Sequence, residues 1–173
     1  MFARAVAVLV LVAGAVLPAS PGVAVEDNPS PWTPYDGEDW VTEAGEVCSF
    51  AMGGEVVSDK ERYRTTAWFP DGSPRYQEWT GQLIVRFTNL DSGESVERNL
   101  TGRGDFEYFA DESWTLTAVG GHFAGAIRPG GDPGPGWYVV TGSGYTLHSD
   151  ADGDRTLTYG NGTVEDVCET LGR

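Results

Sequence analysis

The stretch from Arg75 to Gly102 constrains the fold most, because its side chains alternate between apolar and polar around a central turn. In its first half, the apolar side chains that share one face are Trp79, Leu83, Val85 and Phe87. A period of two is typical of a strand with one buried and one solvated face. Gly93 ends the turn and can adopt the left-handed conformation that closes a type I turn with a bulge. The pattern predicts a long antiparallel hairpin.

Shorter segments of the same kind occupy the rest of residues 47–173, which we expect to form one domain. Turn-forming residues separate them, and no segment is long enough for a crossover helix. Besides the two arms of the hairpin, the expected strands are 47–52, 61–69, 105–110, 114–119, 122–127, 137–141, 144–149 and 155–159. We expect an all-β fold, a single antiparallel barrel of about eight strands that is lipocalin-like in shape, with a β-sandwich as the alternative. A capping-box pattern over 163–166 predicts a short C-terminal helix through Leu171.

The first 24 residues have the pattern of a secretory signal peptide. One positive charge, Arg4, precedes an apolar run from Ala5 to Leu17, and small residues follow up to Ala24. No other run approaches the ~20 apolar residues of a transmembrane helix. We therefore expect a secreted, extracellular protein without membrane insertion.

Residues 25–46 form an acidic, proline-rich segment that we expect to be a flexible tether. It contains three large aromatic residues, Trp32, Tyr35 and Trp40, which are unfavourable to leave in water. The alternative is a docking segment for a partner. We favour the tether, with some of these rings packed on the domain.

The chain is strongly acidic. The chain has 26 acidic against 11 basic residues, a formal net charge of −15. A surface of this sign repels nucleic-acid phosphates and anionic lipid, so both kinds of partner are disfavoured.

The two cysteines, Cys48 and Cys168, lie near the two ends of the expected domain. In an exported protein such a pair is typical of a disulfide, and neither has a neighbouring His or Cys that would indicate a metal site. Closing so long a loop stabilises the fold by about 4–5 kcal/mol at most.

Three carboxylates at alternate positions, Asp150, Asp152 and Asp154, are a candidate calcium site, because hard cations prefer oxygen ligands. The spacing departs from the EF-hand pattern, in which Gly would stand in place of Arg155. The simpler interpretation is a hairpin turn built around Asp152-Gly153, and we favour it.

Several large side chains are candidates for a ligand-binding interior. The candidates are Trp79, Trp114, His122, Trp137 and Tyr145. The aromatic rings could equally fill a small barrel completely, which is the commoner arrangement. His122 follows a double glycine and could act as a base or hydrogen-bond a ligand, although a structural histidine is the commoner case. The residues do not assemble a nucleophile–base–acid triad, and they imply no cofactor.

The chain resembles a group of small exported proteins of actinobacteria for which no activity is established. The residues that carry the resemblance are 48–50 (CSF), 87–96 (FTNLDSGESV), Asn99, Gly102, 134–136 (GPG), 150–154 (DADGD) and 166–168 (DVC). They are turn residues and cysteines, so the resemblance implies a disulfide-linked β-barrel and carries over no catalytic residue. Arg98 stands where the alternation of that strand would favour an apolar residue.

Three hypotheses for the function follow. The first, which we prefer, is an exported, non-catalytic and monomeric binding module for an unknown partner. The second is a carrier of a small hydrophobic ligand inside the barrel. The third is a small hydrolase or isomerase that uses His122 and a nearby carboxylate as an acid–base pair.

Overall fold

The structure, a computed structural model, describes residues 28–172. The predicted signal peptide lies outside the described residues. The strands are β1 (Thr33–Pro34), β2 (Trp40–Thr42), β3 (Met52–Asp59), β4 (Arg62–Trp68), β5 (Pro74–Gly81), β6 (Leu83–Asn89), β7 (Ser95–Asn99), β8 (Gly102–Tyr108), β9 (Trp114–Ile127), β10 (Gly136–Ser143), β11 (Thr146–Ser149), β12 (Arg155–Thr158) and β13 (Asn161–Asp166), followed by the helix α1 (Val167–Leu171). The paired strands run antiparallel, so the all-β antiparallel class and the short C-terminal helix are confirmed.

The strands β5 to β8 form the predicted hairpin. Its two ladders share one register, from Tyr76 opposite Glu107 in β5–β8 to Thr88 opposite Ser95 in β6–β7. Gly93 has a φ of +78° and closes the turn in the left-handed conformation, as expected.

The hairpin bends between β5 and β6, at Gly81 and Gln82. The backbone of Lys60 and Glu61 passes so close to Gly81 that a β-carbon there would collide with it. Only glycine allows this approach. The bend places β5 and β8 in a nine-stranded sheet, ordered β1-β4-β5-β8-β9-β10-β13 with β11 and β12 attached to β9, and β6 and β7 in a four-stranded sheet, ordered β2-β3-β6-β7.

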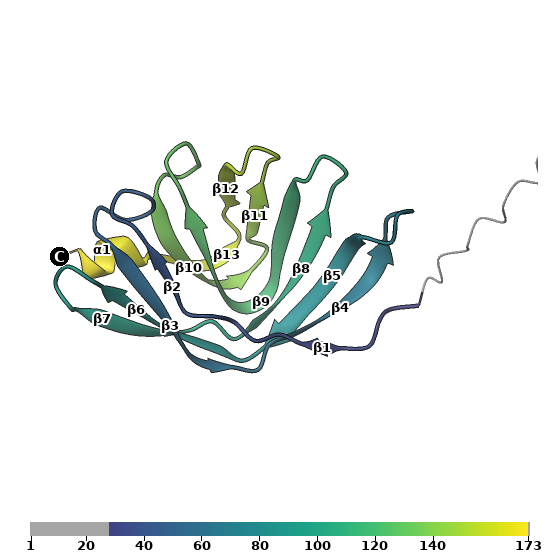
Figure 1. Cartoon of the computed structure of the whole chain (residues 1–173), viewed down its shortest axis with the longest axis horizontal. Coiled ribbons are helices and arrows are strands. Elements are labelled where there is room, and N and C mark those ends of the chain that lie inside the picture. The colour runs from purple at the N-terminus through teal and green to yellow at the C-terminus, as the bar shows by residue number, and fades with distance from the viewer. Residues whose placement is uncertain (1–27, 173) are drawn as a thin grey trace, which may run out of the picture.

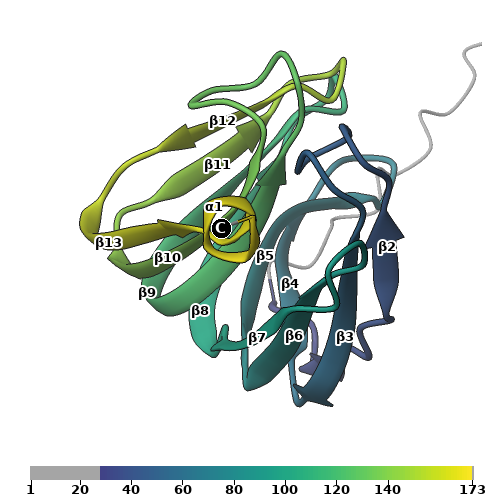
Figure 2. The same cartoon turned by 90° about the vertical axis from the view of Figure 1, so that its left-hand side faces the viewer.

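Over residues 28–172 neither sheet closes on itself, so the prediction of a closed barrel is wrong. The ladder between β8 and β9 ends where Gly102 lies opposite Gly121, and β9 then pairs with β10 while β7 stays with β6. The two edges therefore diverge instead of joining. Figure 1 shows the resulting open, curved shape, and the perpendicular view of Figure 2 shows two groups of strands facing each other, as in the sandwich alternative.

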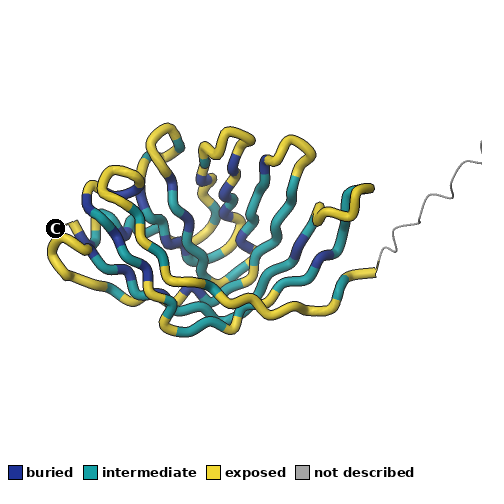
Figure 3. The backbone as a smooth tube through the Cα atoms, viewed as in Figure 1, coloured by how far each residue is buried: buried dark blue, intermediate teal, exposed yellow. Residues whose placement is uncertain are grey.

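Two clusters of buried side chains form the core of the protein. The first packs the four-stranded sheet and α1 against β9 and β10, and its buried members are Val47, Cys48, Phe50, Met52, Val85, Phe87, Leu100, Val139, Val167 and Leu171. The second lies among β9 to β12, and its buried members are Ala118, Ile127, Val140, Tyr145, Leu147 and Leu157. In Figure 3 these buried stretches lie along the strands, and the loops at the rim are exposed.

The disulfide Cys48–Cys168 is confirmed, and it joins the segment before β3 to α1 across 120 residues. Both cysteines belong to the first cluster or pack against it. Among the described residues, no helix has the length and apolar character to cross a membrane.

Residues 28–46, in which we expected a tether, lie along the sheets as outer strands. Thr33 and Pro34 pair with β4, and residues 40–42 pair with β3. Trp40 packs on the first cluster, where its ring stacks 4.3 Å from that of Trp137 at an interplanar angle of 17°. Short strands and a partly buried indole thus lie where composition indicated a flexible chain with some rings packed on the domain.

Candidate ligand-binding cleft

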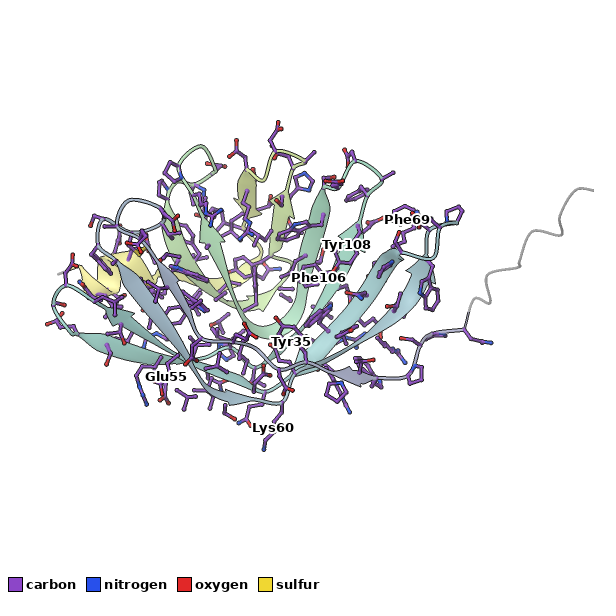
Figure 4. The ribbon with its side chains drawn as sticks, viewed as in Figure 1. Tyr35, Glu55, Lys60, Phe69, Phe106 and Tyr108 are labelled. Carbon is purple, nitrogen blue, oxygen red and sulfur yellow. A yellow bond between two sulfur atoms is a disulfide. The ribbon has the colours of Figure 1, made fainter. Side chains whose placement is uncertain are left out.

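The strands β4, β5, β8 and β9 turn one face toward the inside of the curved structure. Tyr63 lies opposite Trp79, and Phe106 lies opposite Leu116, so these side chains share that face. Figure 4 shows Phe106 and Tyr108 inside the bend. We call this surface the concave face, and its members are Tyr63, Gln77, Trp79, Phe106, Tyr108, Trp114 and Leu116.

Aromatic rings of the concave face contact one another in a row. The centroid of Trp79 lies 4.9 Å from that of Tyr63 and 5.7 Å from that of Phe106. Phe106 in turn lies 5.6 Å from Trp114. Tyr35, from the segment after β1, meets Trp79 edge-on at 5.1 Å and 69°. These spacings are within the favourable range for aromatic pairs.

Gln77 fixes the orientation of two of these side chains. Its Oε1 accepts hydrogen bonds from Trp79 Nε1 at 3.2 Å and from the Tyr108 hydroxyl at 3.0 Å. Its amide nitrogen donates to Thr65 Oγ1 at 3.2 Å, and its side chain is buried. A buried amide with both ends satisfied holds its partners in one arrangement.

A cleft of about 310 Å³ opens on the concave face where the two sheets diverge. Gly102 and Gly104 leave room there, and a β-carbon on Gly104 would lie 2.7 Å from the Leu116 side chain. The lining is mainly apolar: Tyr35, Trp79, Leu83, Leu100, Phe106, Leu116, Phe123 and Ala124, with Glu61, Thr80, Arg103 and His122 as polar members.

Glu61 is the carboxylate of the cleft. Partial burial, and secondarily the negative charge of Asp59, raise its pKa from 4.5 to about 7. Asp59 is held in place by the backbone N–H groups of Gly37 and Glu61, both at 2.7 Å. Among residues 28–172, no hydrogen bond or ion pair reaches the Glu61 carboxylate, in contrast to Glu78, which pairs with Arg64 at 2.6 Å. A perturbed, partly buried acid in a cleft is typical of a functional site.

His122 enters the same cleft from β9. Its Nδ1 lies 2.9 Å from the hydroxyl oxygen of Thr141, which faces it on β10. The cleft therefore brings together His122 and a carboxylate, the two groups that the acid–base hypothesis requires.

Two of the five predicted ligand-binding residues, Trp79 and His122, line the cleft. Trp114 lies on the concave face beyond Phe106, with the Arg155 guanidinium 5.3 Å from its ring. Trp137 and Tyr145 pack in the two buried clusters.

Most of the lining residues were not among the predicted ligand-binding residues, and the most prominent of these are Tyr35, Glu61 and Phe106. Tyr35 lies in the segment expected to be a tether with some rings packed on the domain, and its aromatic side chain was the signal for this packing. Glu61 lies in the connection between β3 and β4, Phe106 occupies an ordinary strand position, and no signal in the sequence distinguishes them from their neighbours.

Asp150, Asp152 and Asp154 lie in the turn between β11 and β12. The Asp150 carboxylate accepts the backbone N–H groups of Asp152 at 3.0 Å and Asp154 at 2.9 Å. Gly153, with a φ of +90°, takes the left-handed position of the turn. This is the hairpin turn of the simpler interpretation, and within residues 28–172 no three side chains of His, Cys, Asp or Glu gather as a metal-binding group.

Comparison of the chain with protein-family models, with curated proteins and with solved structures found no match. The geometry defines an all-β protein with an open cleft that aromatic side chains line.

Proposed function

We propose that this chain is an exported, non-catalytic binding protein that holds a small, mainly apolar molecule with a flat ring in the cleft. The observation that carries this proposal is the apolar lining of the cleft, with rings of Tyr35, Trp79 and Phe106 beside a few polar groups. Ligand sites are typically concave, mostly apolar and supplied with a few oriented polar groups. At about 310 Å³ the cleft is at the small end of the usual range, which favours a compact ligand.

The arrangement of the cleft also favours binding over simple packing. Filled cores bury their large side chains, whereas Tyr35 keeps 43% of its surface exposed at this site. The Gln77 hydrogen bonds hold Trp79 in place before any ligand arrives, and such preorganisation lowers the entropic cost of binding. Export is supported by the predicted signal peptide and by the disulfide, which is typical of oxidising compartments.

The test is a fluorescence titration of the purified protein with N-phenyl-1-naphthylamine, a neutral, ring-bearing apolar probe. We expect saturable binding at one site and an affinity loss of about fivefold or more in Phe106→Ala, since aromatic contacts of this kind are worth about 1 kcal/mol. The matched control is Trp32→Ala, because Trp32 stacks on Arg62 and Arg64 and does not line the cleft. Equal affinity in Phe106→Ala and the unaltered protein would exclude the cleft as the site.

A further inference from the structure

We propose that the ligand of the cleft is an organic cation, an alkylammonium group attached to an apolar body, with Glu61 as its anionic partner and the rings of Tyr35 and Trp79 as its walls. This inference rests on the proposed function, because it names the chemical class of the ligand that the cleft takes.

Strand pairing places the aromatic side chains of Tyr35, Tyr63 and Trp79 near Glu61. Tyr35 lies directly across from Glu61, since its N–H donates to the Glu61 carbonyl at 2.9 Å. Tyr63 follows two residues later on the same face and stacks on Trp79 at 4.9 Å. Tyr35 meets Trp79 at 69°, so the two rings form adjoining walls at a steep angle to each other. Figure 4 shows Tyr35 near the floor of the bend, below Phe106.

On its other side Glu61 faces Gly81, which has no side chain. The backbone of Glu61 passes so near the Gly81 Cα that any larger residue would collide with it. The open volume next to Glu61 is that of the cleft, which Glu61, Tyr35 and Trp79 line together.

The charges of the cleft are unbalanced in favour of a cation. The Glu61 carboxylate has no ion pair or hydrogen bond among the described residues, and the neighbouring Asp59 adds a second negative charge. Arg103 also lines the cleft, but its guanidinium lies 3.9 Å from Glu78 on the opposite face of the sheet. A ligand that brings a positive charge would pair an otherwise unpartnered, partly buried acid.

The aromatic walls favour the same class of ligand. Faces of Trp and Tyr attract cations, and cages of such rings are the usual recognition site of alkylated ammonium groups. An anionic ligand would be repelled by Glu61 and Asp59. A metal ion would need several ligating side chains, and Asp59 already accepts two backbone N–H groups.

The experiment compares two probes of the same shape, benzyltrimethylammonium and its uncharged carbon isostere neopentylbenzene, by calorimetry at pH 8. We expect the cation to bind about tenfold more tightly than the isostere. Glu61→Gln, which keeps the shape of the side chain, is expected to abolish this preference. Glu55→Gln, on the outer side of the bend in Figure 4, is the matched control and should keep the preference.

Lowering the pH to 5 should reduce the preference for the cation in the unaltered protein and have no such effect in Glu61→Gln. The other titratable or charged groups that line the cleft are Tyr35, Arg103 and His122, and Asp59 lies beside Glu61 outside the lining. The variant separates their contribution from that of Glu61. Circular dichroism of each variant checks that the fold is retained.

The outcomes separate the two proposals. Equal binding of the cation and the isostere, together with binding of N-phenyl-1-naphthylamine, overturns the cation proposal and leaves the binding function in place. Binding of none of the three probes overturns both. Preference for the cation that survives in Glu61→Gln removes Glu61 from its proposed role.

Discussion

Glu61 places a carboxylate in the cleft without a partner among the described residues, and the folded chain responds by favouring its protonated form. The pKa rises from 4.5 to about 7, chiefly because the side chain is partly buried and secondarily because Asp59 lies near. Since the pKa of an unfolded Glu is about 4.3, the folded state binds more protons than the unfolded state between about pH 4.5 and 7. The free energy of unfolding therefore falls as the pH rises through this window.

The first prediction concerns this residue. Glu61→Gln should raise the free energy of unfolding by about 1 kcal/mol at pH 8, after allowance for solvent screening of a partly exposed group. Below about pH 4 the variant and the unaltered protein should be equally stable, because the acid is then protonated in both states. Urea denaturation across pH 4 to 8 measures the difference. A variant that is destabilised equally at every pH would contradict the assignment.

The second prediction concerns Glu112, which has a φ of +71° in the turn between β8 and β9. In this turn the Phe109 N–H donates to the Ser113 carbonyl at 2.9 Å. The turn between β4 and β5 has the corresponding hydrogen bond, from the Phe69 N–H to the Ser73 carbonyl, also at 2.9 Å. There the equivalent position is Gly72, with a φ of +87°.

Because a left-handed backbone is unfavourable for residues other than glycine, Glu112→Gly should stabilise the protein by about 0.5–1 kcal/mol. The reverse change, Gly72→Ala, should destabilise it by about 1 kcal/mol. Thermal unfolding of the two variants is the measurement, and a destabilised Glu112→Gly would show that the turn tolerates its glutamate without strain.

At the scale of secondary-structure elements, β2 shows that the N-terminal segment belongs to the fold. Trp40 packs edge-on against Phe87 at 5.8 Å and stacks on Trp137. Its neighbour Val41 points outward and keeps 61% of its surface exposed.

The third prediction is that Trp40→Ala lowers the free energy of unfolding by about 2–3 kcal/mol, because the large, partly buried ring packs on the first cluster and its loss leaves a cavity. Val41→Ala, one residue away, should change it by less than about 0.5 kcal/mol. Chemical denaturation of both variants decides between a packed strand and a tether, and equal effects would favour the tether.

Arg98 joins two outer strands, β7 and β13, which are not hydrogen-bonded to each other. Its Nε and Nη2 donate to the two carboxylate oxygens of Glu165 at 2.7 and 2.6 Å. Thr170 in α1 donates to Glu165 at 2.8 Å. Arg98 lies opposite Val85, on the face where the alternation favours an apolar residue. Its pair with Glu165 of β13 explains why a charged residue stands there.

The fourth prediction follows from this pair. The Arg98 hydrogen bonds, together with that from Thr170, hold the pKa of Glu165 below its usual value, so the stabilisation is present above the unfolded pKa of about 4.3 and is lost as the pH falls below it. Arg98→Met should cost about 1 kcal/mol at pH 7 and progressively less as the pH falls below the unfolded pKa. Arg86→Met, which breaks more exposed pairs with Glu55 and Glu97, is the control and should have a smaller effect. Guanidinium chloride would screen the charges, so urea is the denaturant.

At the scale of the whole molecule, an open sheet lacks the edge-to-edge hydrogen bonds that would close a barrel, and the disulfide ties the two layers together instead. Cys48 precedes β3 in one layer, and Cys168 lies in α1 beside the other. The cross-link spans 120 residues, so it restricts the unfolded chain strongly.

The fifth prediction is that replacing both cysteines, Cys48→Ala with Cys168→Ala, lowers the free energy of unfolding by about 2–5 kcal/mol. Denaturation of the oxidised protein and of the double variant measures this loss. Identical midpoints would show that packing of the first buried cluster alone holds the layers together.

The sequence by itself determined the all-β class, the hairpin with its turn at Gly93, the turn at Gly153 and the disulfide, whereas the register around Arg98 came from the structure. Each depends on local chemistry: alternation defines the buried face of Trp79 and Phe87, Gly93 and Gly153 permit their turns, and two cysteines have only each other to pair with. These signals come from neighbours in the chain, so they can be read from it.

Only the tertiary structure decided that the sheet stays open and where the cleft lies. Closure would require the β8–β9 ladder to continue past Gly102 as pairing between β7 and β9, and the alternation of side chains is the same in either case. Likewise Tyr35 follows β1, Glu61 precedes β4 and Phe106 lies in β8, and long-range strand pairing brings all three into the lining of the cleft. A pattern of single residues records which face a side chain occupies, whereas a site depends on which strands lie side by side.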